Sequence, residues 1–312
     1  MDSITFNGKV IAPGEQRYVD LRIAKLPTHT PIDLPIYISR ARQEGPTLLL
    51  TAGLHGNEIN GIEIVRRLIA SNVLHPERGT VVAVPVVNIY GFLQQERYLP
   101  DGKDLNRSFP GNKNGSLAGR VAFAIVNQIL PIIDVGVDFH TGGASKDNYP
   151  QTRCVLAHED NRELAAAFSA PFTLNSPLID RSFRKAAHRR GKSIIVYEGG
   201  ESLRLDEQAI QHGIDGTLRL MKWLGMKSNA PQAILANRVL EKSVWVRARV
   251  SGLFRTELQP GDKISRNQPL GSISDPFGET EIEVKSPSNG YIVGLNRLPV
   301  VSAGDALIHL GH

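Results

Sequence analysis

The chain has 312 residues, of which 41% are hydrophobic and 21% charged, a length and composition that suit one large globular domain and a smaller one. Its formal net charge is +5, and basic and acidic residues are mixed along the sequence, which excludes the clustered basic patch of a nucleic-acid-binding protein and fits a small anionic substrate. No apolar run approaches the roughly 20 residues that span a bilayer, the amino terminus lacks a signal-peptide pattern, and the single cysteine excludes an internal disulfide, so we expect a cytoplasmic protein with no membrane partner.

Along the chain, the segment before Thr47 is interpreted as extra strands and a proline-rich loop. From Thr47 to Leu224, short apolar runs alternate with longer amphipathic stretches, which is typical of a layered α/β domain with a parallel or mixed sheet and flanking helices. The runs that predict strands are Thr47–Ala52, Thr80–Val87, Ile132–Phe139, Arg153–Ala157 and Ser193–Tyr197. The stretches that predict helices are Ile59–Ser71, Leu117–Ile129, Asn161–Phe168 and Asp206–Leu224.

The composition changes after Trp223, and residues 227–232 are interpreted as a linker. We therefore predict a catalytic domain over residues 1–228 and a separate all-β domain over residues 238–312. Residues 251–270 and 289–308 share a strand–turn–strand pattern, which indicates a barrel-sandwich fold resembling lipoyl or biotinyl carrier domains. The corresponding hairpin, residues 274–279, has no lysine, so carrier chemistry is not expected.

The first candidate site motif follows the predicted strand that ends at Ala52, and it reads Gly53-Leu-His-Gly-Asn-Glu58. His55 and Glu58 stand where a loop turns into a helix, so their side chains can point into one space. Imidazole nitrogen and carboxylate oxygen are ligands that zinc favours. Taken alone, a polar turn with Glu58 in the first helical turn explains this motif equally well.

The second motif, Asp104-Leu-Asn-Arg-Ser-Phe-Pro-Gly111, is preceded by Arg97 and Tyr98. Arginine grips a carboxylate with two parallel hydrogen bonds and can stabilise an oxyanion. A surface loop with Asp104 as a capping residue is the alternative.

Two further motifs end predicted strands. His140, in Asp138-Phe-His-Thr-Gly142, is a third candidate metal ligand, and Asp138 can orient an imidazole. Glu198, in Val196-Tyr-Glu-Gly-Gly200, is a candidate general base and acid. Glu201 is its competitor, but two glycines separate it from the strand. Cys154 is interpreted as a small core residue rather than a nucleophile.

These four motifs, in this order, resemble the succinylglutamate desuccinylase/aspartoacylase branch of the zinc carboxypeptidase fold. The resemblance covers roughly residues 34–224 and implies a zinc-dependent amidohydrolase with one Zn²⁺ per chain. It implies that His55, Glu58 and His140 bind the metal. It also implies that Arg97 polarises the scissile carbonyl, that Asn106 and Arg107 hold the substrate's carboxylate, and that Glu198 promotes the attacking water.

The resemblance predicts deacylation of a small N-acyl amino acid or a related amide. A metallocarboxypeptidase acting on peptides and a non-catalytic metal-binding protein of the same fold are the alternatives. A further substrate-binding basic residue is expected within Arg184–Arg190, and whether the chain forms a homo-oligomer is left open.

Overall fold

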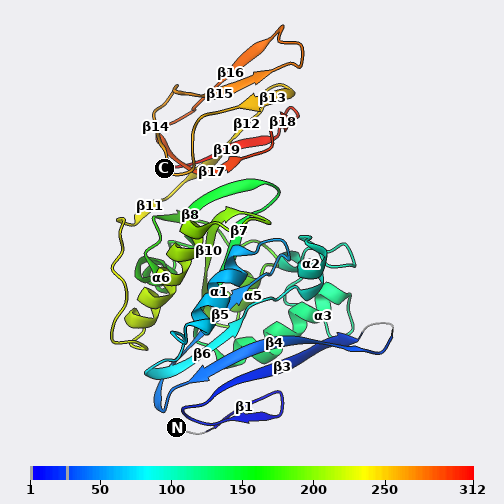
Figure 1. Ribbon diagram of the computed structural model, residues 1–312, viewed down its shortest axis with the longest axis vertical. Helices are drawn as coiled ribbons and strands as arrows, with labels where there is room; N and C mark the ends of the chain where they lie inside the picture. The colour runs from blue at the N-terminus through cyan, green and yellow to red at the C-terminus, as the bar shows by residue number, and fades with distance from the viewer. Residues whose placement is uncertain (1–2, 26–27) are drawn as a thin grey trace.

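The computed structural model describes residues 3–25 and 28–312, and its central feature is one long mixed sheet. The strand order in this sheet is β12-β19-β17-β8-β10-β7-β5-β6-β4-β3, with β9, β11 and β14 paired beside that path. Figure 1 shows the sheet passing through the middle of the molecule, with helices on both of its sides and the carboxy-terminal strands at one end. The expected mixed α/β architecture is therefore confirmed.

The strands up to the carboxy-terminal part are β1 (Ile4–Phe6), β2 (Lys9–Ile11), β3 (Gln16–Lys25), β4 (Pro31–Arg40), β5 (Gln43–Ala52), β6 (Arg78–Val84), β7 (Val135–Gly142), β8 (Lys146–Cys154), β9 (Phe172–Asn175) and β10 (Ser193–Glu201). The helices are α1 (Asn60–Ala70), α2 (Ile89–Gln94), α3 (Leu117–Ala124), α4 (Glu159–Phe168), α5 (Phe183–His188) and α6 (Glu207–Trp223), with the short turns η1 (Leu105–Arg107), η2 (Ile125–Ile129) and η3 (Leu130–Ile132). The extra strands expected before Thr47 are present as β1 to β4. The four predicted helices are present within one or two residues of their expected starts, although residues 125–129 form a π-helical turn rather than part of α3.

The central strands are buried on both faces, which explains their continuous apolar sequence. Because successive side chains on a strand point to opposite faces, Leu49 of β5 packs into one core while Leu48 and Leu50 pack into another. The first core is closed by α3 and α5, and the second by α1, α4 and α6. The sheet is thus held between two helical layers.

One predicted strand was misplaced. The sequence pattern predicted a strand over residues 153–157, but β8 covers Lys146–Cys154. Most of β8 is polar. This strand pairs with β10 on one side and with β17 and β9 on the other, so its pairing partners rather than its own hydrophobicity define it.

After α6, the described part of the chain forms strands and no helix. These strands are β11 (Arg238–Leu240), β12 (Ser243–Arg247), β13 (Gly252–Arg255), β14 (Lys263–Ile264), β15 (Pro269–Ser274), β16 (Glu281–Lys285), β17 (Gly290–Asn296), β18 (Val300–Val301) and β19 (Ala306–Gly311). β13, β15, β16 and β18 form a separate four-stranded sheet, whereas β12, β17 and β19 extend the long sheet, and a cluster of apolar side chains joins the two layers.

The two half-motifs of the carboxy-terminal segment form the same turn. Asp262 accepts a hydrogen bond from the backbone N–H of Gln259 at 2.8 Å, and Asp305 accepts one from the backbone N–H of Ser302 at 2.7 Å. The glycine before each aspartate has a left-handed φ, 98° in one turn and 94° in the other. The sequence similarity between the halves therefore corresponds to a repeated turn.

None of the helices formed by residues 3–25 and 28–312 is long and apolar enough to cross a membrane.

We predict that the thiol of Cys154 does not react with Ellman's reagent in the folded protein at neutral pH. Cys154 is fully buried, and burial raises the pKa of its thiol to about 11, so little thiolate forms and the reagent has no access. In guanidinium chloride the same thiol should titrate as one per chain. Rapid labelling of the native protein would contradict the buried position of β8.

Candidate active site

Parallel pairing of the central strands brings the candidate residues to one edge of the sheet. β5 pairs with β7 so that Ala52 lies opposite Phe139, and β7 pairs with β10 so that His140 lies opposite Glu198. The carboxyl ends of parallel strands meet at one edge, which is where ligands bind in open α/β sheets. The loop after β5 therefore lies beside His140 and, one strand further, Glu198.

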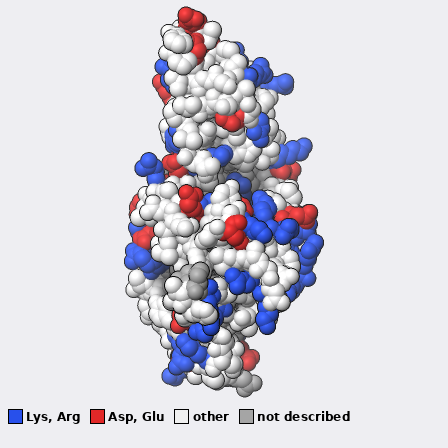
Figure 2. All heavy atoms as spheres, turned by 90° about the vertical axis from the view of Figure 1, so that its right-hand side faces the viewer, with Lys and Arg blue, Asp and Glu red and all other residues white. Residues whose placement is uncertain are grey.

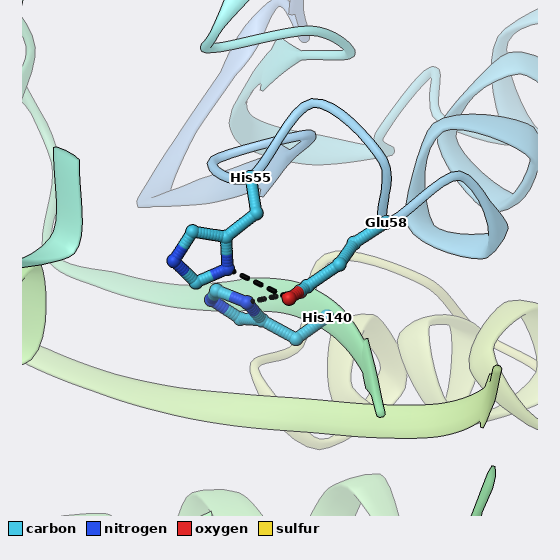
Figure 3. A group of neighbouring side chains, drawn as sticks. All are labelled: His55, Glu58 and His140. Carbon is cyan, nitrogen blue, oxygen red and sulfur yellow. Dashed lines mark hydrogen bonds and ion pairs between the residues drawn. The ribbon is translucent and has the colours of Figure 1, made fainter. Parts of the chain in front are cut away.

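His55, Glu58 and His140 converge at this edge, and their side chains point toward one another in Figure 3. Nδ1 of His55 lies 2.8 Å from Oε1 of Glu58, and Nδ1 of His140 lies 2.7 Å from Oε2 of the same carboxylate. One donor atom from each residue lies within 4.8 Å of the others, and all three residues are buried. The structure thus brings together the three residues predicted to bind metal.

The loop between β5 and α1 can adopt this shape because of its glycines. Gly53 has a left-handed φ of 61°. A Cβ on Gly56 would lie 1.9 Å from the backbone carbon of Gly91, so only glycine allows the loop to pack against α2. These two positions fix the path of the chain from the end of β5 to Glu58.

Two carboxylates orient the imidazoles from behind. Nε2 of His140 lies 2.9 Å from Asp138, whose other oxygen accepts a hydrogen bond from Thr51 at 2.7 Å. Nε2 of His55 lies 3.2 Å from Asp104. Each histidine therefore directs Nδ1 toward Glu58. The role expected for Asp138 matches its contact, whereas the contact of Asp104 was missed because the sequence indicated only a capping residue.

The charged forms of Glu58 and His140 stabilise each other in this cluster. Burial alone would raise the pKa of the Glu58 carboxyl, but the charges and hydrogen bonds of His55 and His140 hold that pKa well below its usual value. Burial likewise would lower the pKa of His140, yet Asp138 and Glu58 raise it well above its usual value. Two imidazole nitrogens and one carboxylate oxygen, converging and buried, fit a divalent metal such as zinc.

The residues of the arginine motif lie beside this cluster. Nη1 of Arg97 is 3.2 Å from Oε1 of Glu58, and Nη2 is 3.0 Å from Asp104. Asn106 accepts a hydrogen bond from the backbone N–H of Phe183 at 2.9 Å, which ties η1 to the start of α5. Arg107 is exposed and donates to the backbone carbonyl of Asn106 at 2.7 Å, a bond that occupies one of its five N–H groups.

Glu198 and its competitor Glu201 have different surroundings. The side chain of Glu198 is 16% exposed and borders the cavity beside the metal-ligand candidates. Glu201 lies at the end of β10, where its nearest ion-pair partner is Arg204 at 3.5 Å, and it does not line that cavity.

One cavity of about 590 Å³ is lined by all seven residues to which the family resemblance assigned a role in metal binding, substrate binding or catalysis. Of the basic residues between 184 and 190, Arg184 lines it, while Lys185, Arg189 and Arg190 line a separate hollow. Sequence reasoning missed further lining residues, and among them four have no motif of their own and lie on paired strands: Lys146, Asn148, Arg153 and Trp245.

One face of the molecule carries side chains of both charges. Figure 2 shows basic and acidic side chains interspersed over one face of the molecule, with Lys and Arg more densely grouped along one side. The positive charge does not form an unbroken stripe on this face.

Comparison with known proteins identifies relatives of this chain. Residues 44–224 match the model of the succinylglutamate desuccinylase/aspartoacylase catalytic domain. The chain is 30% identical over 291 residues to N-alpha-acetyl-L-2,4-diaminobutyric acid deacetylase of Halomonas elongata, an alignment covering 88% of this chain and 84% of the relative. Among solved structures, a succinylglutamate desuccinylase/aspartoacylase from Rhodobacter sphaeroides is 26% identical with a TM-score of 0.84, covering 96% of this chain and 94% of the other. An aspartoacylase family protein from Mesorhizobium loti is 25% identical with a TM-score of 0.83, covering 96% and 95%.

Proposed function

Since the chain belongs to the succinylglutamate desuccinylase/aspartoacylase family, we propose that it is a zinc-dependent deacylase that hydrolyses the amide bond of a small N-acylated amino acid. The observation that carries the proposal is the single cavity that combines a buried two-histidine, one-carboxylate cluster with a nearby glutamate and several arginines. The name of the relative from Halomonas elongata, a deacetylase of an N-acetylated amino acid, favours this substrate class.

In this proposal His55, Glu58 and His140 hold one zinc ion per chain. Zinc held there supplies a Lewis acid that polarises a carbonyl oxygen and makes a neighbouring water more acidic. Asp104 and Asp138 keep the two imidazoles turned toward the ion.

Glu198 is the proposed general base and acid. Its carboxylate takes a proton from the attacking water and then delivers a proton to the leaving amine. Arg97 lies beside Glu58, one of the three proposed metal ligands. This position supports a role in stabilising the negative charge that develops on the carbonyl oxygen. Asn106 and Arg107 are proposed to hold the substrate's carboxylate, because the guanidinium of Arg107 keeps free donors at the rim of the cavity.

The carboxy-terminal strands are proposed to form a barrel-sandwich domain over residues 238–312, without a carrier lysine, that narrows access to the cavity of the domain at residues 1–228. Trp245 of β12 lines the cavity and stacks on His309 of β19, with ring centroids 4.4 Å apart. A wall of this kind favours small substrates over long peptides. Contacts between copies of the chain are the alternative role for this segment.

A substrate panel tests the proposed function. Zinc-loaded protein is incubated with N-acetyl, N-formyl and N-succinyl amino acids and with short peptides, and release of free amine is measured. We expect hydrolysis of at least one N-acyl amino acid and much slower hydrolysis of the peptides. Preferred cleavage of peptides would instead identify a metallocarboxypeptidase. No hydrolysis by fully metal-loaded protein would identify a non-catalytic metal-binding protein.

We predict that the purified protein contains one zinc ion per chain, measured by mass spectrometry of the metal, and that His55→Ala loses most of it. Removing one of three protein ligands weakens the site directly and leaves Glu58 with one imidazole partner. His188→Ala is the matched control, because His188 is exposed and stacks on His158 outside the site. Full metal content in His55→Ala would refute the assignment.

We predict that Glu198→Gln folds and retains its metal but loses roughly 10²–10⁴-fold in kcat, because an amide cannot accept the proton of the attacking water. Glu201→Gln serves as the control in the same strand and should stay close to the wild type, since Glu201 does not line the cavity. The opposite ranking of the two variants would assign the base to Glu201.

A further inference from the structure

Strand β8 lies between the strand of the proposed base and the carboxy-terminal strands. On one side it pairs antiparallel with β10, placing Gln151 opposite Glu198. On its other side it pairs antiparallel with β17, placing Asn148 opposite Gly294. The side chain of Gln151 adds a hydrogen bond of 3.0 Å to the backbone carbonyl of Val293. β8 therefore connects the base physically with the carboxy-terminal segment.

The carboxylate of Glu198 is held through one of its two oxygens. Nδ2 of Asn148 donates to Oε2 at 2.7 Å, and Nη2 of Arg153 lies 3.0 Å from the same oxygen. Both donors come from β8. Within residues 3–25 and 28–312 no hydrogen bond to Oε1 is found, so one oxygen is fixed while the other stays available to accept a proton. Such support determines the direction of a catalytic carboxylate.

The amide of Asn148 depends in turn on Gly294. A Cβ added to Gly294 would lie 2.5 Å from Oδ1 of Asn148, closer than real Cβ atoms approach another heavy atom. The φ of Gly294 lies outside the left-handed region, so the backbone conformation does not require glycine. Asn148 is buried but borders the cavity, so this Cβ would force its amide to shift from its present position. Space for this amide is therefore the structural reason for glycine at this position.

We propose that the carboxy-terminal strands position the catalytic base: Gly294 leaves space for Asn148, and Asn148 with Arg153 fixes Oε2 of Glu198. Gly294, Asn148 and Arg153 are positioning residues. Asn148 and Arg153 act through the carboxylate of Glu198, and Gly294 acts through Asn148. This inference rests on the proposed function of Glu198. It gives the carboxy-terminal segment a role in the chemical step, distinct from narrowing access to the cavity.

The test is Gly294→Ala, a change outside the cavity. The added methyl displaces Asn148, so kcat should fall about 10- to 100-fold, the range expected when a catalytic group is misplaced by about 1 Å. KM and metal content should stay within about twofold, because substrate and metal contacts are unchanged. Asn148→Ala should lower kcat similarly. The double variant should be no slower than Asn148→Ala alone, since both changes act on one hydrogen bond.

Arg297→Ala is the control at the same strand pair. Arg297 forms an ion pair with Asp147 at 2.7 Å, and among the described residues its side-chain hydrogen bonds go to Asp147 and Gln259 rather than to Asn148. Its loss should therefore weaken the contact between β8 and β17 without moving the amide. Its kcat should stay within about twofold of wild type. An equal loss in Arg297→Ala would attribute the effect to general loosening and overturn the proposal. An unchanged kcat in Gly294→Ala, or additive effects in the double variant, would also overturn it.

Crystal structures of the wild type and Gly294→Ala provide a readout that does not depend on activity. The proposal requires the distance between Nδ2 of Asn148 and Oε2 of Glu198 to lengthen beyond hydrogen-bonding range in the variant; an unchanged distance overturns it. A wild type that hydrolyses no substrate refutes the proposed function, whereas this distance still tests the coupling. If Gly294→Ala does not fold, an unchanged kcat in Asn148→Ala overturns the proposal.

Discussion

The site is organised around one buried carboxylate. Glu58 is 2% exposed, and a carboxylate in such surroundings is stable only when positive charge compensates for its lost hydration. His55 and His140 supply that compensation from two sides, and Arg97 adds a third contact. The outer carboxylates Asp104 and Asp138 then stabilise the imidazoles. Acidic and basic side chains thus alternate outward from Glu58, so the orientation and charge of each side chain depend on its neighbour.

The sheet makes this network possible because its register is rigid. A shift of β7 by one residue relative to β5 would turn His140 to the opposite face and leave Glu58 with one imidazole. Such a shift is opposed by the two cores, since Leu49 and its neighbours Leu48 and Leu50 are packed on opposite sides of the sheet. The hydrophobic layers therefore help to position the polar groups at the edge of the sheet.

The sequence was informative where a local pattern determines structure. The apolar runs of β5 and β10 and the amphipathic face of α6 predicted these elements closely, and the motifs at the strand ends predicted which residues meet. β8 was misplaced because its sequence is largely polar. Asn148, Arg153 and Trp245 escaped prediction for a related reason: antiparallel pairing between segments far apart in the chain brings them to the cavity, and no spacing within the sequence encodes that pairing.

The continuous sheet also limits how the two parts of the chain can evolve independently. β17 covers residues 146–148 at the edge of β8, beside β9, which covers residues 151–154. An uncovered edge strand presents a row of unpaired backbone groups that invites association with other chains. An ancestor lacking the carboxy-terminal strands would have needed another cover for that edge. A carboxy-terminal segment taken from a relative would therefore have to present a strand able to pair with residues 146–148 of β8, which limits how freely this segment can be exchanged.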